Sequence, residues 1–310
     1  MRPIRVELPT PFAVGPVNAY VYPEDPVTIV DPGPLYPPAQ DAFAEGLRQA
    51  GVRLGDIKHI VVTHHHPDHA GYAPLLAQTS GADLLMHPEA AERAAFPYRD
   101  ENASETLLRR HGVPEAILDA MRRELVRIVG FMAPLRTFRP LQEGEVVTAG
   151  SNSLKALVLP GHAPGHLCLQ GQDHVAGGDL LIWGITPNPI FEVGSDGRRP
   201  SLREYRESLR RVRGLPVVTW LPGHRNDVAD PIALINRYEG QMAQRQDKLW
   251  SLLATGPKTA FALSQELFPV DSGADPFLAV SETLAQLDGL LQAGRVRTRT
   301  GDALISFEAM

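Results

Sequence analysis

The segment of this sequence best suited to chemistry is residues 63–69, which read Thr-His-His-His-Pro-Asp-His and follow the apolar, β-branched run KHIVV. Such a run predicts a short buried strand. Residues two apart in an extended segment point the same way, so His64 and His66 can direct their imidazoles at one metal ion. The proline then starts a turn, beyond which Asp68 and His69 can serve a second ion. This nitrogen and oxygen ligand set suits zinc, iron or manganese.

Four ligands cannot complete two coordination shells, and three further candidates each follow a strand-like run. They lie in the short segments LPGH, GGD and PGH. Glycine lets the backbone approach a metal closely, and a carboxylate can bridge two ions. Loops at strand ends are the usual place for ligands in α/β proteins. The predicted ligand set, from four loops, is His64, His66, Asp68, His69, His162, Asp179 and His224.

The elements that must position these residues are predicted from hydrophobic periodicity and turn residues. Strands and helices alternate at first, a helical stretch follows at 88–139, and strands return after residue 145. The expected strands include 17–22, 27–30, 58–63, 154–159 and 217–221, and the expected helices include 38–50, 201–212 and 231–256. The fold class is therefore α/β. The helical stretch either packs on the core or shapes a substrate pocket.

The C-terminal residues 251–310 are predicted to form a separate winged-helix-like domain. Two amphipathic helices precede two strand-like runs, which are joined by a turn at Gly301-Asp302. The catalytic domain is accordingly expected at residues 1–250. Residues 255–310 contain four basic and seven acidic residues, and only the wing carries a local positive stripe. A packing or dimerisation role is therefore favoured over nucleic-acid binding.

Composition excludes several classes of protein. The chain has 310 residues, of which 43% are apolar, and a formal net charge of −6. An acidic chain is a poor fit to a dedicated nucleic-acid binder, and no apolar run is long enough to predict a transmembrane helix. The single cysteine, Cys168, excludes an intramolecular disulfide framework and fits a reducing compartment. We expect a cytoplasmic protein that does not insert into membranes.

The histidine motif, together with PGH at His162, GGD at Asp179, PGH at His224 and VDPG at Asp31, resembles the metallo-β-lactamase fold superfamily. The resemblance covers residues 17–230 and implies a four-layer αββα sandwich with a dinuclear site. It also implies the division of ligands. One metal would be held by His64, His66 and His162, the other by Asp68, His69 and His224, with Asp179 as the bridge.

Other residues receive roles by the same resemblance or by position. Asp31 and His65 are interpreted as residues that orient the ligands, or as a turn cap and a packed histidine. Trp183 follows Asp179 and is expected at the pocket wall, where a core position is the alternative. Arg225 replaces the glycine that often follows the last histidine, so it could narrow the pocket or offer a cation to the substrate.

The expected activity is hydrolysis of an acyl thioester, ester or lactone, a small-molecule substrate, by a hydroxide that bridges two divalent ions. Zinc is the expected metal, with iron or manganese as alternatives. Asp179 would hold the bridging hydroxide, and Asp68 is a candidate proton acceptor.

The C-terminal helices also resemble the branch containing β-lactamase-like endoribonucleases and thioesterases. Cleavage of single-stranded RNA is thus a second hypothesis, and an iron-dependent sulfur dioxygenase is a third. A homodimer is an open alternative.

Overall fold

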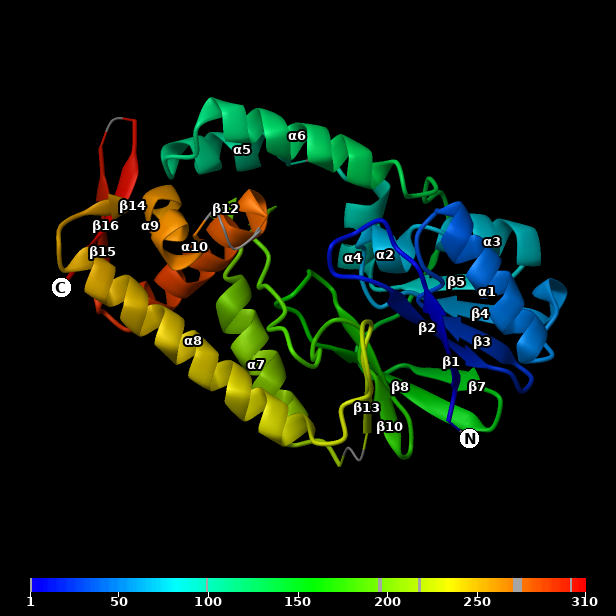
Figure 1. The fold of residues 1–310 in the computed structure, drawn as a ribbon. Coiled ribbons are helices and arrows are strands. Elements are labelled where there is room, and N and C mark those ends of the chain that lie inside the picture. The colour runs from blue at the N-terminus through cyan, green and yellow to red at the C-terminus, as the bar shows by residue number, and fades with distance from the viewer. Residues whose placement is uncertain (1, 99, 195–196, 217–218, 270–274, 302) are drawn as a thin grey trace. The chain divides into compact units, whose positions relative to one another are not determined.

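The computed structural model describes residues 2–98, 100–194, 197–216, 219–269, 275–301 and 303–310 (Figure 1). The chain divides into two compact units. The first consists of Met1–Pro97, Arg127–Pro187 and Arg210–Leu234, and the second of Tyr98–Val126, Asn188–Leu209 and Ile235–Met310. The sequence predicted a domain boundary at residue 250 and a helical insertion at 88–139. Both concern which segments of the chain fold independently, so both stay predictions.

The first unit contains a six-stranded sheet in the order β1-β2-β3-β4-β5-β6, antiparallel up to β3 and parallel from there on. Neighbouring residues of a strand face opposite sides, as the period of two requires. Ile29 and Ile60 pack against helices on one side, whereas Val30 and Val61 face the second sheet. The strands are β1 (Ile4–Leu8), β2 (Val17–Tyr22), β3 (Val27–Val30), β4 (Ile57–Val61), β5 (Asp83–Met86) and β6 (Arg139–Pro140).

A five-stranded sheet in the order β13-β10-β9-β8-β7 completes the sandwich of the first unit. Leu154, Ala156 and Leu169 of this sheet share a buried core with Tyr20 and Tyr22 of the first sheet. The strands are β7 (Val146–Ala149), β8 (Asn152–Val158), β9 (Leu167–Gln170), β10 (His174–Ala176) and β13 (Thr219–Leu221). Residues 217–218 of the strand expected at 217–221 lie outside the described residues.

Helices cover the outer face of the first sheet because their apolar stripes complete its core. Phe43 of α1 and Leu76 of α3 are buried against this face. The helices of this part are α1 (Pro37–Gln49), the short 3-10 turn η1 (Leu54–Asp56), α2 (Pro67–Ala70), α3 (Ala73–Ser80) and α4 (Pro88–Ala95). The strands and the helix expected in the first ninety residues are thus confirmed.

The second unit has its own core, in which Leu249, Leu284, Leu287 and Phe307 are buried together. The expected order of two helices followed by a hairpin is present in α9, α10 and the β15–β16 pair, although Asp302 of the expected turn lies outside the described residues. The remaining helices are α5 (Glu101–Arg110), α6 (Glu115–Val129), α7 (Ser201–Arg213), α8 (Pro231–Leu253), α9 (Ala260–Leu267) and α10 (Pro276–Gln292). The remaining strands are β11 (Val193–Gly194), β12 (Gly197–Arg198), β14 (Lys258–Thr259), β15 (Val296–Thr300) and β16 (Ile305–Ala309). Among the described residues, no helix combines the length and the apolarity needed to cross a membrane.

Candidate metal centre

The histidine motif begins at the end of β4 and continues into helix α2. His66 has an extended backbone and occupies the position before the helix, which starts at Pro67. Proline suits the first helical position because its fixed φ is already helical and its missing N–H has no helical partner there. The change from extended chain to helix turns Asp68 and His69 back beside His64, and His64 and His69 lie with ring centroids 4.2 Å apart.

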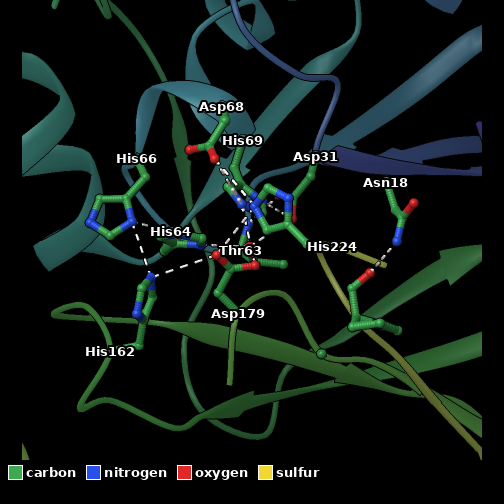
Figure 2. Close-up of polar contacts among 12 residues, drawn as sticks. Asn18, Asp31, Thr63, His64, His66, Asp68, His69, His162, Asp179 and His224 are labelled. Carbon is green, nitrogen blue, oxygen red and sulfur yellow. Dashed lines mark hydrogen bonds and ion pairs between the residues drawn. The ribbon is translucent and has the colours of Figure 1, made fainter. Parts of the chain in front are cut away.

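The other predicted ligands also follow strands. His162 follows β8, Asp179 follows β10 and His224 follows β13. Figure 2 shows these side chains pointing toward the histidine motif from the second sheet. The seven predicted ligands, which span 160 positions of sequence from His64 to His224, are therefore gathered at one place.

Three imidazoles form the first cluster. His66 Nδ1 lies 2.9 Å from His64 Nε2 and 3.1 Å from His162 Nε2. Two nitrogens bound to zinc at about 2.0–2.1 Å in tetrahedral geometry lie roughly 3.3 Å apart. The spacing of the three nitrogens therefore fits a shared divalent ion.

Asp68, His69 and His224 form the second cluster, and Asp179 lies between the two. Asp68 Oδ2 is 3.2 Å from His224 Nε2 and 4.0 Å from His69 Nε2. Asp179 Oδ1 is 3.4 Å from His69 Nε2, while Asp179 Oδ2 is 3.5 Å from His224 Nε2 and 3.8 Å from His162 Nε2. One carboxylate thus contacts members of both clusters (Figure 2).

Several buried atoms of the centre have no hydrogen-bond partner within the described part of the chain. These atoms are His69 Nε2, His224 Nε2 and Asp179 Oδ1. Buried polar atoms are normally paired, and leaving one unpaired costs about 1–3 kcal/mol. Here the atoms face one another at distances that suit coordination, so the residues present fit a bound divalent metal.

Three histidines each have an oxygen atom within hydrogen-bond distance of Nδ1, the outer ring nitrogen, which points away from the clusters. His69 Nδ1 lies 2.9 Å from Asp31 Oδ2, and His224 Nδ1 lies 2.7 Å from the Pro16 carbonyl. His64 Nδ1 lies 3.0 Å from Thr63 Oγ1. When the outer nitrogen donates its hydrogen, Nε2 keeps its lone pair for a metal.

Asp31 and Thr63 connect these contacts. The Thr63 hydroxyl donates to Asp31 Oδ2 at 2.7 Å, and the Thr63 N–H donates to Asp31 Oδ1 at 2.8 Å. Because the hydroxyl hydrogen goes to Asp31, the hydroxyl oxygen is left to accept from His64. The sequence had suggested Asp31 as an orienting residue, and the structure places it against His69. The contribution of Thr63 was missed, although it directly precedes the motif.

Electrostatics favour neutral imidazoles in the first cluster and a cation in the second. Burial lowers the pKa of His64 well below its usual value, and the neighbouring His69 adds to this effect. Burial also lowers the pKa of His69, but the carboxylates of Asp179 and Asp68 outweigh it and raise this pKa well above its usual value. Buried carboxylates require a positive charge beside them. A bound divalent ion would supply that charge.

Glycine at position 223 lets the His224 turn close against the centre. A β-carbon there would lie 2.2 Å from Asp179 Oδ1 and 2.5 Å from His69 Cε1, which is far inside van der Waals contact. The glycine of this PGH motif is therefore a steric requirement of the site.

Two further histidines border the clusters. The ring of His65 is centred 4.8 Å from that of His66, and burial lowers the pKa of His65 to about 3. His166 is fully buried, stacks on His64 with ring centroids 5.0 Å apart, and accepts a hydrogen bond at 3.1 Å from the Asp179 N–H. His166 was not among the predicted site residues, because its bond to Asp179 joins two different loops.

The two predicted pocket residues meet beside the last ligand. Arg225 is exposed, and its Nη1 donates to the Trp183 carbonyl oxygen at 3.0 Å. The Trp183 side chain is also exposed, with 52% of its surface accessible. The guanidinium is thereby held against the backbone of Trp183, in the turn that also carries His224.

Comparison with known proteins agrees with this architecture. The model of the metallo-beta-lactamase superfamily matches residues 13–224, and the chain belongs to this superfamily. The chain is 33% identical over 297 residues to the protein named "Probable metallo-hydrolase YqjP" of Bacillus subtilis (strain 168), which covers 93% of this chain and 91% of that protein. The protein is accordingly a metallo-hydrolase of the superfamily, and the predicted fold class and enzyme class are confirmed.

Two more similarities extend the comparison. A hydroxyacylglutathione hydrolase of Methylobacillus flagellatus is 26% identical over 259 residues, which cover 82% of this chain and 79% of that enzyme. The crystal structure of a metallo-beta-lactamase family protein from Thermus thermophilus matches with a TM-score of 0.87 and 28% identity. This match covers 99% of this chain and 98% of that one. The likeness therefore extends beyond the catalytic core to nearly the whole chain.

Proposed function

We propose that this protein is a dinuclear metal-dependent hydrolase that cleaves an acyl thioester, with zinc as the metal. The observation that carries the proposal is the position of Asp179, whose carboxylate lies within 4 Å of His162 in one cluster and of His69 and His224 in the other. A carboxylate shared in this way supports two ions side by side.

Divalent ions at this centre would act as Lewis acids and lower the pKa of water. The chain's own residues divide the remaining tasks. Asp179 fixes the spacing of the clusters, and His166 holds the Asp179 backbone. Asp68 is the candidate proton acceptor, because its carboxylate is buried next to His224 at the centre. Burial by itself would raise the pKa of Asp68. The charges of His69 and His224 lower this pKa by more than burial raises it, so the carboxylate stays ionised and can accept a proton.

An acyl substrate is supported by the relative that hydrolyses hydroxyacylglutathione, which is itself a thioester. Trp183, four residues after Asp179, has an exposed indole that would offer an apolar surface to the substrate, and Arg225, next to His224, would offer a positive charge. Apolar walls with a few fixed polar groups are typical of small-molecule sites. Esters and lactones present the same carbonyl chemistry and belong in the same test.

The charge pattern of the C-terminal residues supports an acyl substrate over RNA. Each of the four basic residues in 255–310 pairs with a carboxylate. Phosphate binding draws its affinity from cations that neutralise the backbone, and cations already paired contribute less. The pairs are Lys258 with Glu266, Arg295 with Asp247, and both Arg297 and Arg299 with Glu308.

The test is a substrate panel on the zinc-loaded protein. It contains acyl-coenzyme A and acylglutathione thioesters, simple esters, lactones and labelled single-stranded RNA, each with Asp179→Asn as control. We expect thiol release from at least one thioester, and its loss in the variant. RNA cleavage that depends on Asp179, without thiol release, would contradict the proposed substrate. Oxygen consumption by a preparation with one iron would contradict the hydrolytic dinuclear centre.

A further inference from the structure

The turn that carries His224 is held by a strand of the opposite sheet. The backbone N–H of Asn18, in β2, donates to the Gly223 carbonyl at 2.7 Å. The Asn18 side chain adds two bonds, from Nδ2 to the carbonyls of Pro222 at 3.0 Å and Arg225 at 2.8 Å. Because β2 belongs to the six-stranded sheet and β13 to the five-stranded sheet, these bonds join the two layers.

A second side chain of β2 acts on the same turn. The Tyr20 hydroxyl donates to the Pro222 carbonyl at 2.7 Å. Tyr20 is almost fully buried, and burial raises the pKa of its hydroxyl well above the usual value, so the donor keeps its proton. The segment just before β2 contributes as well, because the Pro16 carbonyl accepts from His224 Nδ1. Strand β2 and the residue just before it thus fix the backbone of this turn and the ring orientation of His224.

The amide of Asn18 has the polarity that this place requires. Its NH₂ group faces two carbonyl oxygens, which fixes the orientation of the amide, since the reversed amide would place oxygen against oxygen. Asn18 is fully buried, and its Oδ1 has no hydrogen-bond partner among the residues described. One of the two accepting carbonyls belongs to Arg225, whose φ of 64° is left-handed. A side chain with only acceptors would repel both ends of the turn.

We propose that Asn18 is a positioning residue for the metal cluster of Asp68, His69 and His224, assisted by Tyr20. The inference rests on the proposed dinuclear centre. His64, His66 and His162 are carried by other segments, after β4 and β8. Loss of the Asn18 amide therefore weakens one metal equivalent and spares the other.

The experiment is a zinc titration of metal-free protein, read by calorimetry and by elemental analysis, on the wild type, Asn18→Asp and Tyr20→Phe. Asn18→Asp keeps the shape of the side chain but replaces its donor with an acceptor. Partners of metal ligands typically change affinity by about 10–100-fold, and we expect one equivalent to weaken by this factor in Asn18→Asp. The other equivalent stays unchanged. Tyr20→Phe removes one bond of several and produces the same selective loss to a smaller extent.

Two double variants identify the affected cluster. Adding Asp68→Ala to Asn18→Asp should affect only the equivalent that is already weakened and leave the tight one, whereas adding His66→Ala should weaken the tight equivalent. Equal weakening of both equivalents, or unchanged binding in folded Asn18→Asp and Tyr20→Phe, would overturn the proposal. If the wild type binds two zinc equivalents but releases no thiol from any thioester, only the proposed substrate is contradicted. The zinc titration of the Asn18 variants then still tests the positioning role of Asn18.

Discussion

Two buried polar clusters of this protein differ in how their atoms are paired. In the second unit, Glu282 is 4% exposed, and its Oε1 accepts hydrogen bonds from Arg245 Nη1 at 2.8 Å and Gln286 Nε2 at 2.9 Å. In the metal centre of the first unit, by contrast, the inward atoms of His69 and Asp179 find no hydrogen-bond donor or acceptor of their own within the described residues.

The difference distinguishes a structural network from a binding site. A satisfied buried network needs nothing from solution, since each charge already faces an opposite charge or a donor. The candidate metal centre gathers imidazole nitrogens and carboxylate oxygens, with no lysine or arginine among the residues that define it. Buried carboxylates of this kind need a positive charge beside them, which protonated imidazoles or a bound divalent ion would supply. Three predictions test this contrast, from the largest expected effect to the smallest.

Asp179→Asn should reduce turnover by about three orders of magnitude and lower the zinc content, because the amide cannot supply a charged oxygen to both clusters. Steady-state thiol release and elemental analysis measure the two effects. Asp41→Asn, on an exposed position of α1, is the matched control and should change neither. Full activity of Asp179→Asn with two zinc ions bound would contradict the proposal that the Asp179 carboxylate is shared by the two clusters.

Arg245→Met should act on stability and leave the metal centre intact. It leaves Glu282 buried without its cation, and breaking a buried pair in this way costs about 3 kcal/mol of the free energy of unfolding. Burial already raises the pKa of Glu282 despite the lowering effect of Arg245. Urea unfolding measures the loss, and Glu282→Gln added to Arg245→Met should recover part of it. A loss of zinc from the single variant would show that the two clusters are not independent.

His111 should make the second unit sensitive to acid. It is 4% exposed and stacks on Phe307, and burial, with the charges of Arg198 and Arg110, lowers its pKa to about 4. In the unfolded chain the pKa is near the usual 6.5, so above that pH both states are neutral and stability is full. As pH falls from about 6.5 to about 4 the unfolded state binds the proton first, and stability drops by about 2 kcal/mol.

Urea unfolding at about pH 7 and about pH 4.5, on either side of the usual histidine pKa, measures this loss. His111→Phe keeps the stacked ring without a titrating group and should show a smaller decline between the two pH values. An equal decline in the wild type and His111→Phe would assign the acid sensitivity to other groups.

Much of the metal centre could be predicted because its signals are local. The alternation of side chains in extended chain pairs His64 with His66, and Pro67 places Asp68 and His69 beyond the turn. The remaining ligands each follow a strand, and strands of one sandwich end at common edges. The αββα architecture followed from the same motifs through the family resemblance.

The supporting contacts could not be predicted in this way. Thr63 lies beside the motif, but its role depends on Asp31, 32 positions away. His166 was not among the predicted site residues, because its bond to the Asp179 backbone exists only in the folded chain. Arg225 was noted as a departure from the usual glycine, and its left-handed backbone now gives the reason why glycine is common there.

The sequence by itself therefore determined which side chains are the predicted metal ligands, their order along the chain and the strands that precede them. These features depend on residue chemistry and on the two-residue alternation of side chains in extended chain. Tertiary structure alone decided which oxygen each imidazole faces and which sheet holds each loop. Asn18 shows the reason, since its side chain reaches Pro222 across 204 positions of sequence. No local pattern encodes such a contact, which exists only once the two sheets have packed.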